Sequence, residues 1–185
     1  MYYIENKKNK EKKTFGKNNP EGEIFGLDSK VKGFVIVDRT YSVTENLPTF
    51  MLANINPSGM DIDYNIQRLK TIVEIAAQNR VNVLVLPELP VSGYVWDPEN
   101  ENKEEVFNNL KKFVTDGPLV TDLIKYFRSL MTEDGLNLII FNNIRQNGEK
   151  LYDTTYVIGQ DNEYLSCYYD KIFLTPIEKK YFYRG

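Results

Sequence analysis

Hydrophobic and polar positions in the middle of the chain predict a strand, a helix and a second strand. Val81–Leu86 is a short, mainly apolar run that ends at Pro87. Because its apolar residues do not alternate with polar ones, it predicts a strand that is buried on both faces. Upstream, Thr49–Asn56 predicts the other strand, and the two are expected to be parallel neighbours or near neighbours in one sheet.

The segment between these strands has the spacing of an amphipathic helix. It is expected to begin at about Asp61 and to be capped by Asp61 or Asp63, because a carboxylate can accept a hydrogen bond from a backbone N–H of the first turn. The apolar positions recur at steps of four and three residues, which places them on one helix face. These positions are Ile62, Ile66, Leu69, Val73 and Ala76.

Beyond Tyr94 the pattern predicts two helices and then strands joined by tight turns, which is typical of an antiparallel meander. Pro118 suits the first turn of the second helix, and Asn147-Gly148 is a hairpin signal. In chain order we expect helices Glu104–Asp116 and Pro118–Met131, strands Leu136–Asn142, Leu151–Ile158 and Tyr164–Lys171, and turns at Gln146–Glu149 and Gln160–Glu163.

The N-terminal residues differ in composition from the rest. Residues 1–24 are rich in lysine and asparagine and poor in apolar side chains, so they predict a disordered tail. Residues 25–48 are interpreted as an N-terminal extension with one candidate strand, Val31–Val43, whose place in the architecture is open. The main domain is expected to span residues 49–185.

Composition limits the partners. A net charge of −3 and a pI near 5.2 provide no basic field for nucleic acid or an anionic membrane, so neither is expected as a partner. The sequence shows no apolar run long enough to cross a bilayer and no signal peptide, which predicts a cytoplasmic protein. The single cysteine, Cys167, fits a reducing compartment, and no cofactor or metal is expected.

The chain contains no histidine, which excludes Ser–His–Asp and Cys–His hydrolase sites and histidine zinc sites within it. Acid–base chemistry must then use Glu, Asp, Lys or Tyr. Glu88 is the first candidate, because it follows a buried strand at the carboxyl end, where open α/β sheets bind their ligands.

Lys171 is the second candidate, because alternation along the last strand places it on one face with Leu165, Cys167 and Tyr169. A lysine on such a face either reaches solvent or pairs with a carboxylate, for which Glu178 and Glu88 are available. Cys167 is interpreted as a buried core thiol.

Three segments together resemble the carbon–nitrogen hydrolase (nitrilase) superfamily: LVLPEL-x-x-SGY at 84–94, LYDTTYVIG at 151–159 and YYDKIFLTPIE at 168–178. The resemblance covers about Phe50 to Gly185. It implies an α/β fold, part of an α-β-β-α sandwich, and a Glu–Lys–Cys triad that acts on an amide or nitrile carbon. By this resemblance Glu88 is the general base, Lys171 stabilises the tetrahedral intermediate, and Glu178 positions the site.

Such a triad needs no histidine. A carboxylate with a raised pKa can take the proton of a thiol and return it to the leaving amine, and an ammonium can stabilise the oxyanion. The family's cysteine lies a short way beyond the second glutamate, and the sequence ends at Gly185 before that point. Cys167 is a poor substitute, since four strand residues separate it from Lys171, about 13 Å at 3.3 Å per residue.

We therefore interpret the chain as the N-terminal part of a hydrolase, truncated at its C-terminal side and inactive alone, whose substrate is a small amide, nitrile or carbamoyl compound. The alternative is a non-catalytic pseudoenzyme, or a half-domain that pairs with a separately encoded cysteine-bearing partner. The family resemblance also implies a homo-oligomer. Tyr94 and Trp96 either line a substrate pocket or pack over the sheet edge.

Overall fold

The computed structural model describes residues 48–59, 61–94, 102–161 and 167–185, together with the backbone of three strands at 13–14, 22–26 and 33–38. Its strands form one sheet in which spatial order follows chain order, β1 to β8. They are β1 (Lys13–Thr14), β2 (Gly22–Gly26), β3 (Gly33–Asp38), β4 (Phe50–Ile55), β5 (Val83–Val85), β6 (Leu138–Asn147), β7 (Lys150–Gly159) and β8 (Tyr168–Asp170).

The centre of the sheet is parallel and its two sides are antiparallel. β4 pairs with β5, and β5 with β6, in parallel. The other neighbouring strands pair antiparallel, β1 to β4 on one side and β6 to β8 on the other. The two predicted strands, β4 and β5, are therefore parallel neighbours joined by the predicted helix, as expected.

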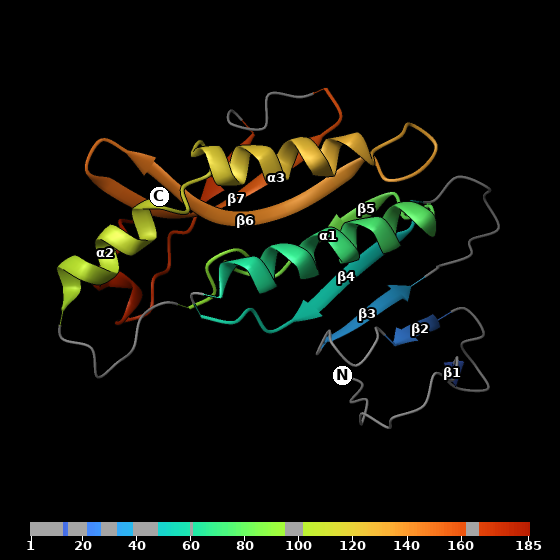
Figure 1. Cartoon of the computed structure of the whole chain (residues 1–185), viewed down its shortest axis with the longest axis horizontal. Helices are drawn as coiled ribbons and strands as arrows, with labels where there is room; N and C mark the ends of the chain where they lie inside the picture. Colours follow the sequence, from blue (N-terminus) through green and yellow to red (C-terminus); the bar gives the residue numbers. More distant parts are fainter. Residues whose placement is uncertain are drawn as a thin grey trace.

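Two helices cover one face of this sheet: α1 (Ile62–Gln78), which connects β4 to β5, and α3 (Pro118–Ser129) (Figure 1). Against them lies a row of fully buried side chains that the strand register aligns, Met51, Leu84, Ile139 and Ile158. The apolar spacing of α1 provides the matching surface, since Leu69, Ile72 and Val73 are also fully buried.

A second apolar cluster lies at one end of the sheet. Here α2 (Lys103–Lys111) packs with the hairpin end of β6 and β7 and with the chain around the short 3₁₀ helix η2 (Glu178–Lys180). Val106 and Leu110 of α2 contact a group that includes Ile144 and Leu151. This cluster holds the last segment of the chain beside the sheet.

The opposite sheet face is open along β4 to β6 in the part of the chain that the structure describes. Alternation along β4 buries Met51 but leaves Phe50 45% and Leu52 55% exposed, and Leu138 of β6 is 36% exposed. Among the described residues, no helix has both the length and the apolar character to cross a membrane.

Several boundaries differ from the sequence-based expectation. The helix predicted over Glu104–Asp116 ends at Lys111. It ends early because Val114 forms a β-bridge with Ile144 and Thr115 donates its N–H to the Ile144 carbonyl. The predicted hairpin turn shifts by one residue, because Asn147 pairs with Lys150.

Other expectations fall partly outside the described residues. β8 covers the end of the strand predicted over Tyr164–Lys171, of which residues 162–166 are not described. β3 lies inside the predicted strand Val31–Val43. β1 and part of β2 lie within residues 1–24, where the rest of the predicted tail is outside the described residues, so the domain boundaries stay predictions.

The turn after β5 provides a test of the fold. Gly93 has φ +64°, and a Cβ there would lie 2.6 Å from the carbonyl oxygen of Ser58. We expect Gly93→Ala to lower the free energy of unfolding by about 1–2 kcal/mol from the left-handed backbone, and by about 1–3 kcal/mol more from overpacking. Urea denaturation of the chain measures the sum of these two losses.

The matched control is Gly148→Ala in the β6–β7 turn. Gly148 has a similar φ of +58°, but a Cβ there meets nothing within 4 Å. It should show the backbone contribution alone, and equal losses in the two variants would contradict the close approach of Gly93 to Ser58.

Candidate active site

Glu88 is held at the carboxyl end of β5 by a strained turn. The next residue, Leu89, has φ +43°, which is unfavourable for a branched side chain. Two contacts maintain it: the Leu89 N–H donates to Oδ1 of Asn142 at 2.8 Å, and its side chain is fully buried in the cluster around α2. The backbone that carries Glu88 is thus fixed from both sides.

The loop that follows Glu88 is tied to α1 through one buried amide. Nδ2 of Asn65 donates to the carbonyls of Val91 at 2.9 Å and Ser58 at 2.7 Å, and its Oδ1 accepts the Ser58 N–H. Gly93 then donates its N–H to the Leu89 carbonyl, which closes the turn. Tyr94 follows and donates its hydroxyl to Oε2 of Glu88 at 2.6 Å.

Lys171 follows β8 and enters the site from the neighbouring hairpin. Its backbone N–H donates to the carbonyl of Asp153 in β7 at 2.8 Å. The side chain of the preceding residue, Asp170, pairs instead with Arg145. This alternation, predicted from the sequence, directs Nζ of Lys171 to Glu88, 2.5 Å from its Oε1.

Glu178 reaches the same ammonium from η2. Its Oε1 lies 3.0 Å from Nζ of Lys171, and its Oε2 accepts the backbone N–H of Thr175 at 2.8 Å. The Thr175 hydroxyl accepts the Glu178 N–H in return, at 3.3 Å. This reciprocal pair has the pattern of a capping box, which fixes the direction of the carboxylate.

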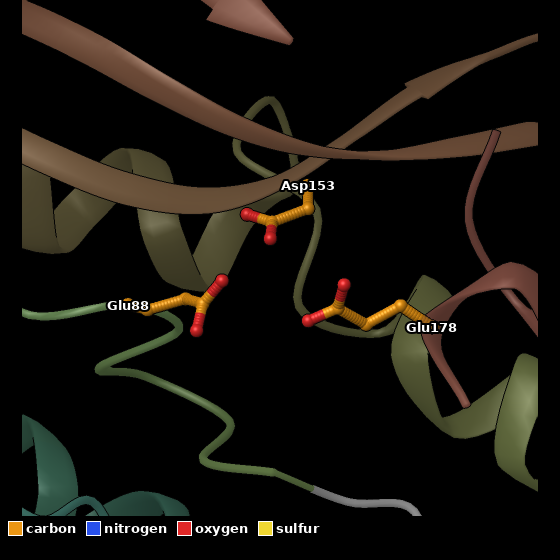
Figure 2. Close-up of side chains that lie close together, drawn as sticks. All are labelled: Glu88, Asp153 and Glu178. Carbon is orange, nitrogen blue, oxygen red and sulfur yellow. The ribbon is translucent and has the colours of Figure 1, made fainter. Parts of the chain in front are cut away.

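Asp153 of β7 is a third carboxylate at this point, which the sequence reasoning did not identify. It is 1% exposed, its Oδ1 accepts from Nδ2 of Asn142 at 2.7 Å, and its Oδ2 lies 3.4 Å from Nζ of Lys171. Figure 2 shows the carboxylates of Glu88, Asp153 and Glu178 converging. The sequence did contain a signal for this carboxylate. Asp153 is an acidic residue among the buried positions of β7, and β7 pairs with β8, the strand that ends just before Lys171.

The ammonium determines the charge state of Glu88. Burial raises the pKa of Glu88, but hydrogen bonds from Lys171 and Tyr94 outweigh burial, and the net pKa lies below the usual value. Burial and the hydrogen bond to Glu88 raise the pKa of Tyr94 to about 12. Glu88 is therefore an anion near neutral pH, and Tyr94 remains a donor.

The raised carboxyl pKa expected at this site belongs to Asp153 rather than Glu88. Burial, together with the proximity of Glu88, raises the pKa of Asp153 to about 6, although the Asn142 amide lowers it. Burial lowers the pKa of Lys171, but Glu88 and Glu178 more than offset that effect, so its net pKa is raised and the ammonium is retained.

The three sequence-predicted catalytic residues, Glu88, Lys171 and Glu178, thus lie in direct contact. Of the two aromatic candidates, Tyr94 contacts Glu88, whereas Trp96 lies outside the described residues. The prediction that Cys167 is a buried core thiol is wrong, because Cys167 is exposed. At this position the sheet face that Cys167 shares with Tyr169 has no cover among the described residues, and Tyr169 is 56% exposed.

The same geometry bears on cation binding. One oxygen from each of Glu88, Asp153 and Glu178 lies within 4.8 Å of the others, a spacing that could hold a metal ion. Nζ of Lys171 lies within 3.4 Å of an oxygen of each of them, so the cluster already has a cation. What the arrangement provides is an anionic base beside an ammonium.

Comparison with protein families matches residues 52–185 to the family described as carbon-nitrogen hydrolase. Among curated proteins no match was found. Solved structures match with 16–22% identity. An amidase from Nesterenkonia sp. matches at a TM-score of 0.56 and 17% identity, with 79% of this chain and 51% of that chain covered.

Two further structures are similar over much the same part. Nit3 of Saccharomyces cerevisiae, a member of the nitrilase superfamily, gives a TM-score of 0.52 at 18% identity, covering 70% of this chain and 45% of that chain. A glutamine-dependent NAD⁺ synthetase from Acinetobacter baumannii gives 0.51 at 22% identity, covering 71% and 23%. These likenesses confirm a nitrilase-like α/β fold. The chain spans between about a quarter and about half of the length of these neighbours.

Removal of the ammonium tests whether it is the common partner of these carboxylates. Lys171→Met leaves three carboxylates without their cation, two of them almost fully buried. A broken buried pair costs about 3–5 kcal/mol, and because the Lys171 side chain is 31% exposed we expect about 3 kcal/mol at pH 7. The loss should shrink toward pH 5, since the carboxyl pKa values rise without the cation and protonation then relieves the repulsion.

Denaturation by urea at both pH values measures this effect. Lys125→Met is the control, because Lys125 also has an ion pair, with Asp122 at 2.9 Å, but its side chain is 71% exposed. It should change stability by less than about 1 kcal/mol at either pH. A pH-independent loss for Lys171→Met would contradict the shared-cation arrangement.

Proposed function

Because the chain belongs to the carbon–nitrogen hydrolase family, we propose that it supplies the glutamate and lysine of a Glu–Lys–Cys site that hydrolyses a small amide, nitrile or carbamoyl compound. The observation that carries this proposal is the ammonium of Lys171, which contacts Glu88 at 2.5 Å and Glu178 at 3.0 Å. Base, cation and positioning carboxylate are thus preassembled in the way this chemistry requires.

In the proposed reaction on an amide, Glu88 takes the proton of a cysteine thiol, and the sulfur attacks the carbonyl carbon. Lys171 stabilises the oxyanion that forms on the former carbonyl oxygen. The C–N bond then breaks, the amine leaves with the proton from Glu88, and a thioester remains. Water, deprotonated by Glu88, cleaves the thioester and regenerates the thiol. Glu178 does not touch the reacting atoms and acts by holding Lys171.

The thiol in this reaction is not Cys167. That residue is exposed and lies four residues before Lys171, a strand distance of about 13 Å. In a structure of the Nesterenkonia amidase, the acetamide moiety of fluoroacetamide is covalently attached to the active-site cysteine. We infer that the corresponding cysteine comes from sequence outside residues 1–185, either in the same polypeptide or in a separately encoded second half.

The open sheet face favours a protein that needs more sequence to be complete. Phe50, Leu52 and Leu138 present apolar surface on that face, where an α-β-β-α sandwich places its second sheet. A pseudoenzyme would have the same open face but no cysteine to receive. Tyr94, 45% exposed beside Glu88, is the candidate for contact with the substrate. A cytoplasmic location and self-association stay predictions.

Ammonia release from a panel of small amides and nitriles tests this function. The chain of residues 1–185 alone should give no turnover. The same chain in the polypeptide encoded by its full reading frame, or co-expressed with a cysteine-bearing second half, should be active. Glu88→Gln and Lys171→Ala should each lower kcat/KM at least about 10³-fold, which corresponds to about 4 kcal/mol of transition-state stabilisation.

Two exposed residues provide matched controls: Lys179→Ala for the lysine and Glu133→Gln for the glutamate. Both should keep activity within about 2-fold, since neither lies in the cluster. Turnover by residues 1–185 alone that depends on Glu88 would contradict the missing nucleophile. No turnover in the complete assembly would instead favour the pseudoenzyme.

A further inference from the structure

The oxygens of the carboxylate cluster differ in how they are satisfied. Glu88 accepts from Lys171 on one oxygen and from Tyr94 on the other. Glu178 accepts from Lys171 on Oε1 and from the Thr175 N–H on Oε2. Both groups are bound as anions, because an ionised carboxylate accepts on both oxygens and has no proton to donate.

Asp153 is the exception. Its Oδ1 accepts from Asn142 at 2.7 Å, whereas its buried Oδ2 accepts no hydrogen bond from the described residues. Its ion-pair contact with Lys171, at 3.4 Å, is the longest of the three that this ammonium makes with the cluster. A buried oxygen without a donor is costly as part of an anion, but it is suited to carry a proton and to donate it.

The charge count leads to the same residue. Three ionised carboxylates and one ammonium give a local charge of −2 at a site where Asp153 and Glu178 are 1% and 4% exposed. The nearby guanidinium of Arg145 is already bound by Asp170 through two of its nitrogens. One bound proton halves the net charge, and Asp153 Oδ2 is the position where it displaces no existing hydrogen bond.

We propose that Asp153 is a positioning residue for the hydrolase site, and that it takes the first proton the cluster binds as the pH falls, donating it from Oδ2 to the carboxylate of Glu88. The step is the binding of one proton from solvent to a carboxylate, with no other bond made or broken. Glu88 remains the anion that faces the substrate, and Asp153 fixes its orientation from the buried side.

The titratable groups that face Asp153 come from every segment around it: Glu88 and Tyr94 after β5, Lys171 after β8, and Glu178 in η2. Glu88 and Glu178 oppose its ionisation, and Lys171 favours it. Burial adds to the opposition, consistent with the raised pKa of Asp153 described above. The inference rests on the proposed function only for its catalytic meaning, since the order of protonation is a property of the chain itself.

A pH titration of the side-chain carboxyl ¹³C resonances in the labelled chain tests the order directly. The Asp153 resonance should move at a pH of about 6, above the pH at which the Glu88 resonance moves, because the pKa of Asp153 is raised and that of Glu88 is lowered. A midpoint for Asp153 at or below that of Glu88, or at the usual value of an aspartate near 3.8, would overturn the proposal. The wild-type chain suffices, so this outcome does not depend on the folding of any variant.

Asp153→Asn and Asp153→Ala separate positioning from simple packing. An amide at 153 can still accept from Asn142 and donate to Glu88, so the Glu88 midpoint should stay within about half a unit of wild type, whereas alanine should shift it by more. Because the pKa of Asp153 is raised on folding, wild-type stability should fall as the pH rises from 5 to 7. In Asp153→Asn this fall should disappear, and an unchanged slope would contradict the assignment.

These measurements need no turnover. If Asp153 does not titrate first, the proposed hydrolase function is unaffected. If the assembled protein releases no ammonia, the titration order still stands as a property of the cluster.

Discussion

The structure depends on one ammonium that three carboxylates share. Nζ of Lys171 contacts carboxylates that come from the end of β5, from β7 and from η2, so side chains from four segments meet at one charge. Each carboxylate would be costly to bury alone, and the cation makes their convergence possible. The elements around it, the strained turn at Leu89 and the capping box at Glu178, serve to bring side chains to this point.

The shared ammonium also sets the strength of the base. At rest Lys171 and Tyr94 stabilise the anion of Glu88, which makes it a weak proton acceptor. In the proposed function, an oxyanion forms nearby, and Lys171 then divides its hydrogen bonds between that oxygen and Glu88. The proton affinity of Glu88 then rises at the moment it has to hold the proton of the thiol. In the proposed function, oxyanion stabilisation and base strength are thus coupled through one side chain.

The sequence contained enough to place the central parts of this arrangement. The apolar run before Glu88, the helical spacing of α1 and the alternation that separates Asp170 from Lys171 are local patterns, and the structure has each of them. The features that the sequence could not reveal depend on tertiary contacts. Helix α2 ends early because Val114 pairs with a strand, Asp153 joins the site because β7 lies beside β8, and Cys167 is exposed because its sheet face is open.

In the proposed function, the open face is also the side from which the nucleophile reaches the site. Strand register places Asp153 opposite Ile144, and alternation from Ile144 back through β6 leads to Leu138, so these side chains point to the face that α1 and α3 do not cover. Lys171 lies on that face as well, and both it and Glu88 remain about one-third exposed. In the proposed function, the segment that carries the cysteine therefore packs against this face, and a single contact surface completes both the apolar core and the catalytic site.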